Sequence, residues 1–339
     1  MRPTAEKGTT SISLVREALA GAERRGFDIG TILTRAHIDP ALLQAPRARV
    51  SAPAFARLWV VLADLLDDEF FGIDSHPMRR GSFRLMCHAS LGGSSLDQAL
   101  RRVLSFLRLV LDDLYGELRY EGEFALLVIH DHGVERRLFS YGTWLILVHG
   151  LLCWLGNRRL PIHSLQFRPA APLDDSDYRM RFCERITFGA PQTVVRLQRS
   201  LLDGEVLQTP ASLDAFMRES PGALLVKYRN SESMSARIRQ LLRDQRPDGW
   251  PELGDLAKAL GLSSSSLQRR LAQEGLNYQR VKDFLRRDMA INLLSRDDLT
   301  VIEVAELTGF QEASAFHRAF KKWTGVSPGA YRRSSAGDN

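Results

Sequence analysis

Residues 253–271 read LGDLAKALGLSSSSLQRRL, and residues 301–322 read VIEVAELTGFQEASAFHRAFKK. Each segment contains a short helix with apolar residues on one side, a glycine turn, and a second short helix whose apolar residues are four positions apart. This pattern is typical of the helix-turn-helix, in which the second helix enters the major groove of DNA. One copy alone is weak evidence, because any two short amphipathic helices produce it. Two copies on one chain favour a DNA-binding domain.

The first copy predicts which side of each helix faces the core. Three residues form the inner side of its leading helix: Leu256, Ala257 and Leu260. Gly261 suits the left-handed position that ends a helix, and the Ser263 hydroxyl suits the cap of the next one. Leu267 and Leu271 are one turn apart and are expected to face inward. Four side chains of the second helix are left exposed: Ser264, Ser265, Gln268 and Arg269. A Gln side chain pairs with adenine and an Arg side chain with guanine.

The second copy follows the same plan. Its inner residues are Val304, Ala305 and Thr308. Gly309 makes the turn, and Phe316 and Phe320 anchor the second helix. The residues left outside are Glu312, Ser314, His317, Arg318 and Lys321. Basic side chains there are suited to bases or to phosphates, and a phosphate contact positions a protein without specifying a sequence.

A single helix is predicted between the two copies, over residues 278–294. Its apolar residues are Val281, Leu285, Met289, Ile291, Leu293 and Leu294. At about 1.5 Å per residue this helix is roughly 25 Å long. A helix of this length is able to place the two second helices near one turn of DNA apart, which is about 34 Å.

The positive charge of the chain is concentrated at its carboxyl end. Residues 227–333 contain 19 Lys and Arg against 13 Asp and Glu, and the net charge of the whole chain is +6. The excess of six positive charges in this segment equals the net charge of the whole chain, so the residues outside it are neutral in sum. Such segregation suits a polyanionic partner, here double-stranded DNA.

The sequence contains no recognisable catalytic or metal-binding motif. It has no Gly-x-Ser-x-Gly, no phosphate-binding glycine loop with Lys, and no His-Glu-x-x-His. His149 and Cys153 are four residues apart on one helix and are interpreted as a core pair, because no further ligand is apparent. The segment His130-Asp131-His132 is interpreted as a solvated turn. We therefore expect no enzyme activity, no metal and no cofactor.

The cysteines and the apolar segments point to a cytoplasmic protein. The chain has three cysteines, which are Cys87, Cys153 and Cys183. Their odd number and the absence of Cys-x-x-Cys spacing favour buried thiols over disulfides. The amino terminus lacks the apolar run of a signal peptide. The most apolar stretch, residues 144–155, is too short to span a bilayer and is predicted to be a buried core helix.

The amino-terminal two thirds mix helical and strand patterns. Helices are predicted over residues 12–22, 53–66, 96–114 and 137–155, with Ser51 capping the second. A β-hairpin is predicted over residues 118–130 with its turn at Glu121-Gly122, and further strands over 164–168 and 193–197. This mixture predicts an α+β domain over residues 1–222. Residues rich in Pro, Ser and Gly then separate it from a domain over residues 223–339.

The carboxyl-terminal residues 309–332, GFQEASAFHRAFKKWTGVSPGAYR, resemble the signature of the AraC/XylS family of bacterial transcription regulators. Residues 256–271 and the linking helix fit the same family. The resemblance implies an all-α domain in which a linking helix joins two helix-turn-helix units. It also implies DNA contacts from Ser265, Gln268 and Arg269 in the first unit, and from Ser314, His317 and Arg318 in the second. Two departures are Gln311, where a capping Ser is common, and the run of four serines at 263–266. Gln268 and Arg269 would then carry most of the base reading in the first unit.

The amino-terminal part resembles the arabinose-binding-like sensor domain of one branch of that family. The resemblance rests on Ile38-Asp-Pro-Ala-Leu-Leu43, Val50, Arg57-Leu-Trp59 and residues 81–101. It implies a transcription regulator, usually an activator, whose small-molecule effector binds within residues 12–210. A homodimer and RNA polymerase are the further partners it implies. The sequence does not identify the effector-binding residues.

Two alternatives remain open. In the first, the amino-terminal domain only dimerises and senses nothing; a filled core would favour this reading, and an apolar-lined pocket would favour sensing. In the second, the chain is an enzyme with a DNA-binding appendage, as in alkylation-repair regulators that resemble this family. The second requires a reactive, metal-held set of cysteines, and the three scattered cysteines do not provide it.

Overall fold

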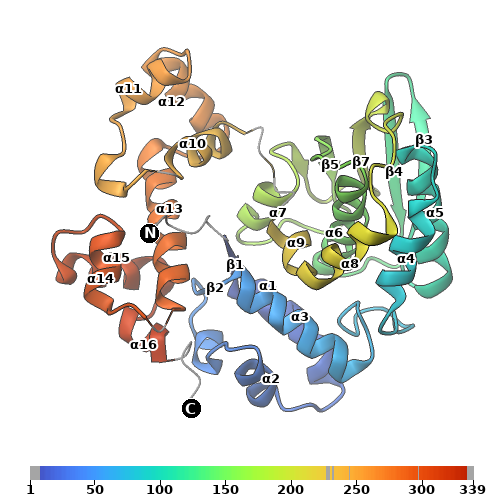
Figure 1. The fold of residues 1–339 in the computed structure, drawn as a ribbon, viewed down its shortest axis with the longest axis horizontal. Helices are drawn as coiled ribbons and strands as arrows, with labels where there is room; N and C mark the ends of the chain where they lie inside the picture. Colours follow the sequence, from blue (N-terminus) through green and yellow to red (C-terminus); the bar gives the residue numbers. More distant parts are fainter. Residues whose placement is uncertain (1–7, 227–229, 231–232, 244, 297, 334–339) are drawn as a thin grey trace. The chain divides into compact units, whose positions relative to one another are not determined.

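The computed structural model describes residues 8–226, 230, 233–243, 245–296 and 298–333 (Figure 1). The chain forms two compact units. Unit 1 contains Met1–Val15, Leu33–Phe55 and Ser231–Asn339, and unit 2 contains Arg16–Ile32 and Ala56–Asn230. The domain boundary near residue 222 stays a prediction. The two units follow a different division, because two segments that precede residue 56 belong to the same unit as the carboxyl-terminal residues.

Unit 2 is built on a five-stranded sheet with the order β3-β4-β7-β5-β6. Its strands are β3 (Tyr115–Glu121), β4 (Phe124–His130), β5 (Ile162–Gln166), β6 (Ile186–Thr187) and β7 (Thr193–Gln198). The predicted hairpin is confirmed, since β3 and β4 pair antiparallel with Glu121 opposite Phe124. Gly122 occupies the turn with φ of 56°, a conformation that glycine adopts without strain. The pair β5–β6 is parallel and the other neighbours are antiparallel, so the sheet is mixed.

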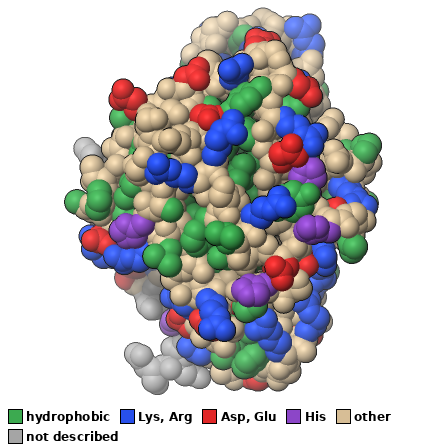
Figure 2. Space-filling view, turned by 90° about the vertical axis from the view of Figure 1, so that its right-hand side faces the viewer, with side chains coloured by type: hydrophobic (Ala, Val, Ile, Leu, Met, Phe, Trp, Pro, Cys, Tyr) green, Lys and Arg blue, Asp and Glu red, His purple; other side chains and the backbone are tan. Residues whose placement is uncertain are grey.

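Helices surround this sheet and complete an α+β arrangement, as predicted. They are α4 (Ser82–Leu91), α5 (Leu96–Val110), α6 (Leu138–Leu155), α7 (Ser176–Arg181), α8 (Pro210–Glu219) and α9 (Gly222–Val226). The 3-10 turn η2 (Arg199–Leu201) also belongs to unit 2, whereas η1 (Pro40–Gln44) belongs to unit 1. On the face seen in Figure 2, basic, acidic and small hydrophobic patches are interspersed, without a broad area of one charge.

The helix predicted over residues 96–114 is shorter in the structure and ends at Val110. Leu111 has extended backbone angles, φ −125° and ψ 137°. The cause lies 38 residues earlier in the chain: the Asp74 carboxylate accepts hydrogen bonds from the backbone amides of Asp112 (2.9 Å) and Asp113 (3.0 Å). These amides are therefore bound to a side chain and are not available to continue the helix. Leu114 is buried as expected, but from the loop that follows.

Helix α6 is the core helix that the apolar run predicted. It is long and apolar enough to cross a membrane by length and composition, but 89% of its apolar window is buried inside the protein. A helix that is hydrophobic on all sides belongs in a core, and this one is packed closely. A Cβ atom on Gly150 would lie 2.6 Å from Leu224 Cδ2.

His149 on α6 is interpreted correctly as a core residue. Its Nε2 lies 2.7 Å from the carbonyl oxygen of Leu160, which can only accept, so Nε2 carries the proton. Cys153 Sγ accepts a hydrogen bond from the Leu160 amide at 3.3 Å. Within the described residues, no cluster of three or more His, Cys, Asp or Glu side chains is able to hold a metal ion.

Acidification is expected to destabilise the protein through His149. Burial lowers the pKa of His149 from 6.5 to about 3. Below pH 6.5 the unfolded chain binds a proton that the folded chain does not, so the free energy of unfolding falls as the pH falls. The expected loss between pH 7 and pH 5 is about 2 kcal/mol. In His149→Gln the glutamine keeps a donor for the carbonyl oxygen of Leu160. The free energy of unfolding of this variant, measured with urea, should depend less on pH than that of the wild type. Parallel pH dependences for the two proteins would contradict this role.

The amino-terminal helices and a two-stranded ribbon complete the fold before residue 67. The helices are α1 (Ile12–Arg24), α2 (Ile29–Arg35) and α3 (Ala52–Leu66), and each of them contributes residues to both units. Ser51 is the predicted cap, since its Oγ accepts from the Ala54 amide at 3.3 Å. The ribbon pairs β1 (Thr9–Ser11) with β2 (Arg49–Ser51) in antiparallel register. The sequence did not predict this ribbon, because each of its strands is only three residues long.

The carboxyl-terminal part of unit 1 is all helical, as predicted. Its helices are α10 (Met234–Leu242), α11 (Leu253–Ala259), α12 (Ser264–Gln273), α13 (Tyr278–Leu294), α14 (Val301–Leu307), α15 (Ala313–Thr324) and α16 (Pro328–Arg333), with one 3-10 turn, η3 (Pro247–Gly249). Helix α13 has the bounds predicted from the sequence and runs between the α11–α12 pair and the α14–α15 pair (Figure 1).

Candidate DNA interface

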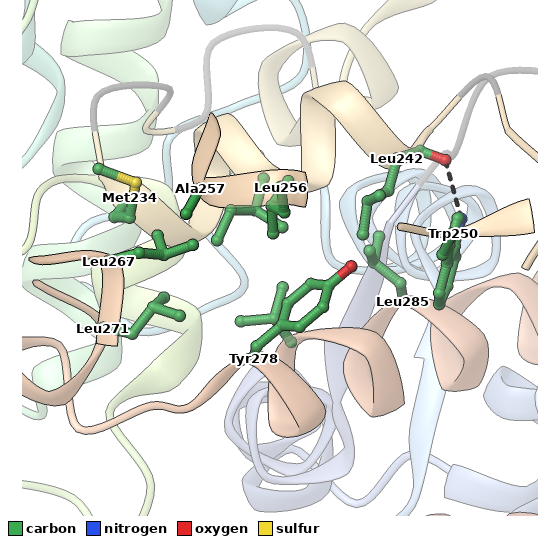
Figure 3. Packing of buried hydrophobic residues seen from close by; sticks show 11 residues of the cluster. Met234, Leu242, Trp250, Leu256, Ala257, Leu267, Leu271, Tyr278 and Leu285 are labelled. Carbon is green, nitrogen blue, oxygen red and sulfur yellow. Dashed lines mark hydrogen bonds between the residues drawn. The ribbon is translucent and has the colours of Figure 1, made fainter. Parts of the chain in front are cut away.

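The first helix-turn-helix consists of α11 and α12 packed on a shared apolar core (Figure 3). Leu256 and Ala257 on α11 meet Leu267 and Leu271 on α12, and all four are at most 1% exposed. Gly261 makes the turn with φ of 68°. Ser263 caps α12 by accepting a hydrogen bond from the Ser266 amide. The predicted inner side, turn and cap of this unit are therefore confirmed.

Contacts that the sequence did not predict hold α12 in place. Glu274 follows the last turn of α12, and its carboxylate accepts from the amides of Met234 (2.6 Å) and Ser235 (3.1 Å). This carboxylate therefore caps the amino terminus of α10. Trp250 lies in the same core and donates from Nε1 to the carbonyl oxygen of Leu242 at 3.2 Å (Figure 3). Helix α12 is thus fixed to α10, which lies outside the helix-turn-helix itself.

The second helix-turn-helix, α14 and α15, has the same construction. Thr300 and Glu303 form a capping box at the start of α14, in which each side chain accepts from the backbone of the other residue. Gly309 makes the turn with φ of 80°. Phe316 and Phe320 on α15 are fully buried, as predicted. The residue at the cap of α15 is Glu312, not Gln311 as the family pattern suggested, and its side chain forms no capping hydrogen bond.

All eight residues predicted to contact DNA are exposed. On α12 they are Ser264, Ser265, Gln268 and Arg269, and on α15 they are Ser314, His317, Arg318 and Lys321. Residues three and four apart share a helix face, so each set forms one surface strip. We call these strips the α12 strip and the α15 strip. They lie opposite the buried leucines of α12 and the buried phenylalanines of α15.

The polar groups of the two strips differ in their availability. The Ser265 hydroxyl lies 3.1 Å from that of Ser263, and the Ser314 hydroxyl donates to Glu312 at 3.2 Å. Within the described part of the chain, neither Arg269 nor Arg318 forms a hydrogen bond or an ion pair through its side chain. Their guanidinium groups therefore have all donors available for a base or a phosphate.

The histidine and cysteine motifs lie outside these strips and do not form a second site. Asp131 is 6% exposed and accepts from Tyr141 Oη at 2.5 Å and from Arg168 at 2.6 Å. The interpretation of His130-Asp131-His132 as a solvated turn is therefore wrong for Asp131, which lies in a buried hydrogen-bond network. Cys87, Cys153 and Cys183 are free and buried, as predicted. Burial raises the pKa of the Cys153 thiol to about 11, so it is not a reactive thiolate at neutral pH.

Two helix-turn-helix units in the helical carboxyl-terminal part of the chain, together with an α+β unit, are typical of a DNA-binding transcription regulator. A family model described as the arabinose-binding domain of AraC transcription regulators, N-terminal, matches residues 26–206. A second model, described as a helix-turn-helix domain, matches residues 256–334. The first match spans more than half of the chain, and the chain belongs to the AraC family.

Full-length relatives are transcription regulators as well. The chain is 27% identical over 318 residues to the ornithine utilization regulator of Pseudomonas aeruginosa, covering 91% of each chain. It is 30% identical over 345 residues to Mb1430, an uncharacterized HTH-type transcriptional regulator of Mycobacterium bovis, covering 92% of this chain and 93% of that one. Among solved structures, the transcriptional regulator CdpR of Pseudomonas aeruginosa is 20% identical, with a TM-score of 0.30 and coverage of 95% of this chain and 97% of that one.

Proposed function

We propose that the protein is a sequence-specific activator of transcription that reads DNA with the α12 strip and the α15 strip. The observation that carries this proposal is the pair of unengaged guanidinium groups, Arg269 and Arg318, one on each second helix. Each lies on the exposed face of a helix that is anchored by buried apolar residues. A rigid helix face with a free bidentate donor is what base recognition in the major groove requires.

Gln268 and His317 extend the two strips beside these arginines. Gln268 is exposed and offers both a donor and an acceptor, the combination that pairs with adenine. Lys321 lies one turn after His317 and suits a phosphate, which would fix the register of α15 on the duplex. Ser264, Ser265 and Ser314 are small, so they allow the helix to approach the groove closely.

The amino-terminal part is proposed to bind a small-molecule effector within residues 12–210. Its match to a family model described as an arabinose-binding domain supports this proposal. A cytoplasmic homodimer with RNA polymerase as a further partner completes the proposed function. No catalytic step is part of it.

The reading residues are tested with the full-length protein and a duplex that the wild type enriches from a randomised library. Arg318→Ala and Gln268→Ala are each expected to weaken specific binding by about 1–3 kcal/mol and to relax the preference at one base pair. Gln279→Ala is the control for Gln268→Ala, because Gln279 is an exposed Gln that lies outside both strips, on α13. Unchanged affinity and unchanged base preference in Arg318→Ala and Gln268→Ala would contradict the assignment.

The effector is tested by native mass spectrometry of the purified full-length protein. A small molecule bound at one per chain supports a sensor and begins its identification. A clean dimer without extra mass favours the alternative, an effector-independent regulator whose amino-terminal domain only dimerises.

A further inference from the structure

Helices α12 and α15 each carry one of the two strips, and we call them the reading helices. How firmly their separation and angle are held determines which spacings between two DNA segments they are able to match. Helix α13 connects the two helix-turn-helix units and packs against helices of both. Direct contacts between the two helix-turn-helix units add to the restraint that α13 itself provides. Such contacts converge on the side chain of Arg286, which lies in the middle of α13.

The Arg286 guanidinium is close to two aromatic rings, one from each helix-turn-helix unit. Its Cζ is 5.2 Å from the centre of the Trp250 ring, and Trp250 lies in the core of the first helix-turn-helix unit. The same atom is 5.8 Å from the centre of the Phe310 ring, which directly follows the turn glycine of the second unit. Both distances are within the range of a cation–π interaction. A single cation thus contacts both units.

Each ring is itself fixed in its own unit. Trp250 is 8% exposed, and its Nε1 is hydrogen-bonded to the carbonyl oxygen of Leu242. Phe310 packs edge-on against Phe316, with 5.6 Å between ring centres, and lies 6.0 Å from Trp323. A change in the position of one ring relative to the other would therefore require one packed core to move relative to the other.

The Arg286 side chain has few competing interactions. Among the described residues, its Nε is buried and has no hydrogen-bond acceptor. The attraction of the two rings for the cation compensates for this burial, and partial desolvation strengthens such an attraction.

A second contact lies beside the first. A Cβ atom on Gly309 would lie 2.8 Å from Pro247 Cβ and 3.4 Å from the Asp248 amide nitrogen. The turn of the second unit therefore packs directly on η3, the short 3-10 turn that precedes α11. The corresponding turn residue of the first unit, Gly261, has nothing within 4 Å of its Cβ position. Of the two turn glycines, Gly309 therefore packs closely against the other helix-turn-helix unit, and Gly261 does not.

We propose that Arg286 is a positioning residue that clamps the two helix-turn-helix units together and sets the spacing between the two DNA segments that the protein accepts. The proposal rests on the proposed function, because it assumes that both strips bind DNA. One inserted base pair moves the second segment by about 3.4 Å and rotates it by roughly 35°. A clamped pair of helices rejects this change, and an unclamped pair adapts to it.

The test compares spacings. The probes are the duplex enriched by the wild-type full-length protein and versions with one base pair added or removed between the two protected segments. The wild type is expected to lose at least about tenfold in affinity on each altered duplex, or ~1.4 kcal/mol. Arg286→Ala should bind the enriched duplex more weakly but lose less than about threefold further on the altered duplexes.

The control is Arg280→Ala. Arg280 is an exposed arginine on the same helix, and its Cζ lies over the ring of Phe284, also on α13. A role limited to phosphate contact or to general stability lowers affinity equally at every spacing. The proposal would be overturned if Arg286→Ala bound every duplex more weakly than the wild type by the same factor. It would also be overturned if the variant bound every duplex as tightly as the wild type.

A DNA-free measurement separates the clamp from the proposed function. Spin labels on Gln273→Cys and Lys322→Cys report the distance between α12 and α15, and the three native cysteines are buried. Arg286→Ala should broaden this distance distribution, and an unchanged distribution would overturn the clamp. Failure of the wild type to enrich any duplex, with a distribution that broadens, would count against the proposed function alone.

Gly309→Ala offers a second approach to the same junction. Its added Cβ would push against Pro247, so it is expected to shift the preferred spacing. Gly261→Ala is its matched control, because it carries the same left-handed strain with open space around the Cβ. An identical spacing preference in both variants would remove the support that the Gly309 contact gives to the proposal.

Discussion

Replacement of Phe316 by Ala is expected to lower the free energy of unfolding by about 3–5 kcal/mol and to abolish specific DNA binding. Phe316 is fully buried at the centre of the second helix-turn-helix. Its ring lies 5.6 Å from that of Phe310 and 5.7 Å from that of Phe320. Removal of the ring leaves a cavity between α14 and α15 that small shifts do not fill. The α15 strip then loses the support that orients it.

Urea unfolding followed by circular dichroism measures the loss, and a mobility-shift assay measures binding. Ile302→Ala is the matched control, since Ile302 is an apolar residue of the same unit that is 61% exposed. The control should change stability by less than about 1 kcal/mol, because little apolar area is lost from the core. A similar small effect for Phe316→Ala would show that the second unit is not held by its aromatic core.

The helix-turn-helix units were predictable because their signals are local. Gly261 and Gly309 supply the left-handed turn conformation, and Ser263 caps the helix that begins at the next residue. Leu267 and Leu271 are one turn apart, which fixes the buried side of α12 and leaves Gln268 and Arg269 exposed. Each of these inferences needs only residues within one helix or its adjoining turn. The exposure of all eight candidate DNA-contact residues followed from them.

Features that depend on distant residues were not predictable. The end of α5 is set by Asp74, far from it in the sequence. The pairing of β1 with β2 joins segments that are 40 residues apart, and each strand is too short to show an alternating pattern. The position of Arg286 close to both Trp250 and Phe310 depends on how the two helix-turn-helix units pack against each other. From the sequence alone, Arg286 is one more basic residue on an amphipathic helix.

The same limit applies to the carboxylate of Asp288, for which we expect a loss of about 3–5 kcal/mol on replacement by Ala. Asp288 on α13 is 4% exposed and accepts a hydrogen bond from Thr9 Oγ1 at 2.7 Å. Thr9 Oγ1 in turn accepts from Arg49 Nε at 2.8 Å, and Arg287 donates to Asp288 at 3.0 Å. Removal of the carboxylate takes away a buried negative charge that lies close to the positive charges of Arg49 and Arg287.

The pH dependence of Asp288 distinguishes its charge from its packing. Burial by itself raises the pKa of a carboxyl, but the positive charges of Arg287 and Arg49 and the Thr9 hydrogen bond outweigh it, so the pKa of Asp288 lies below its usual 3.8. A lowered pKa in the folded state stabilises the protein above the unfolded pKa, and this contribution is lost as the pH falls through the folded value. The wild type and Asp288→Ala should therefore differ most at neutral pH and converge below about pH 4.

Amide hydrogen exchange tests whether the Asp288 carboxylate holds the β1–β2 ribbon in place. Asp283→Ala is the matched control, because Asp283 lies on the same helix and, among the described residues, its side chain accepts only from Gln279, four positions earlier, at 2.9 Å. Asp288→Ala should speed exchange at the paired amides of β1 and β2, and Asp283→Ala should not. The ribbon reaches α13 through Thr9, whose hydroxyl has both of its partners, Asp288 and Arg49, in this network. Unchanged exchange in β1 and β2, with stability lost, would instead mean that the carboxylate only balances charge within α13 and that packing alone holds the ribbon.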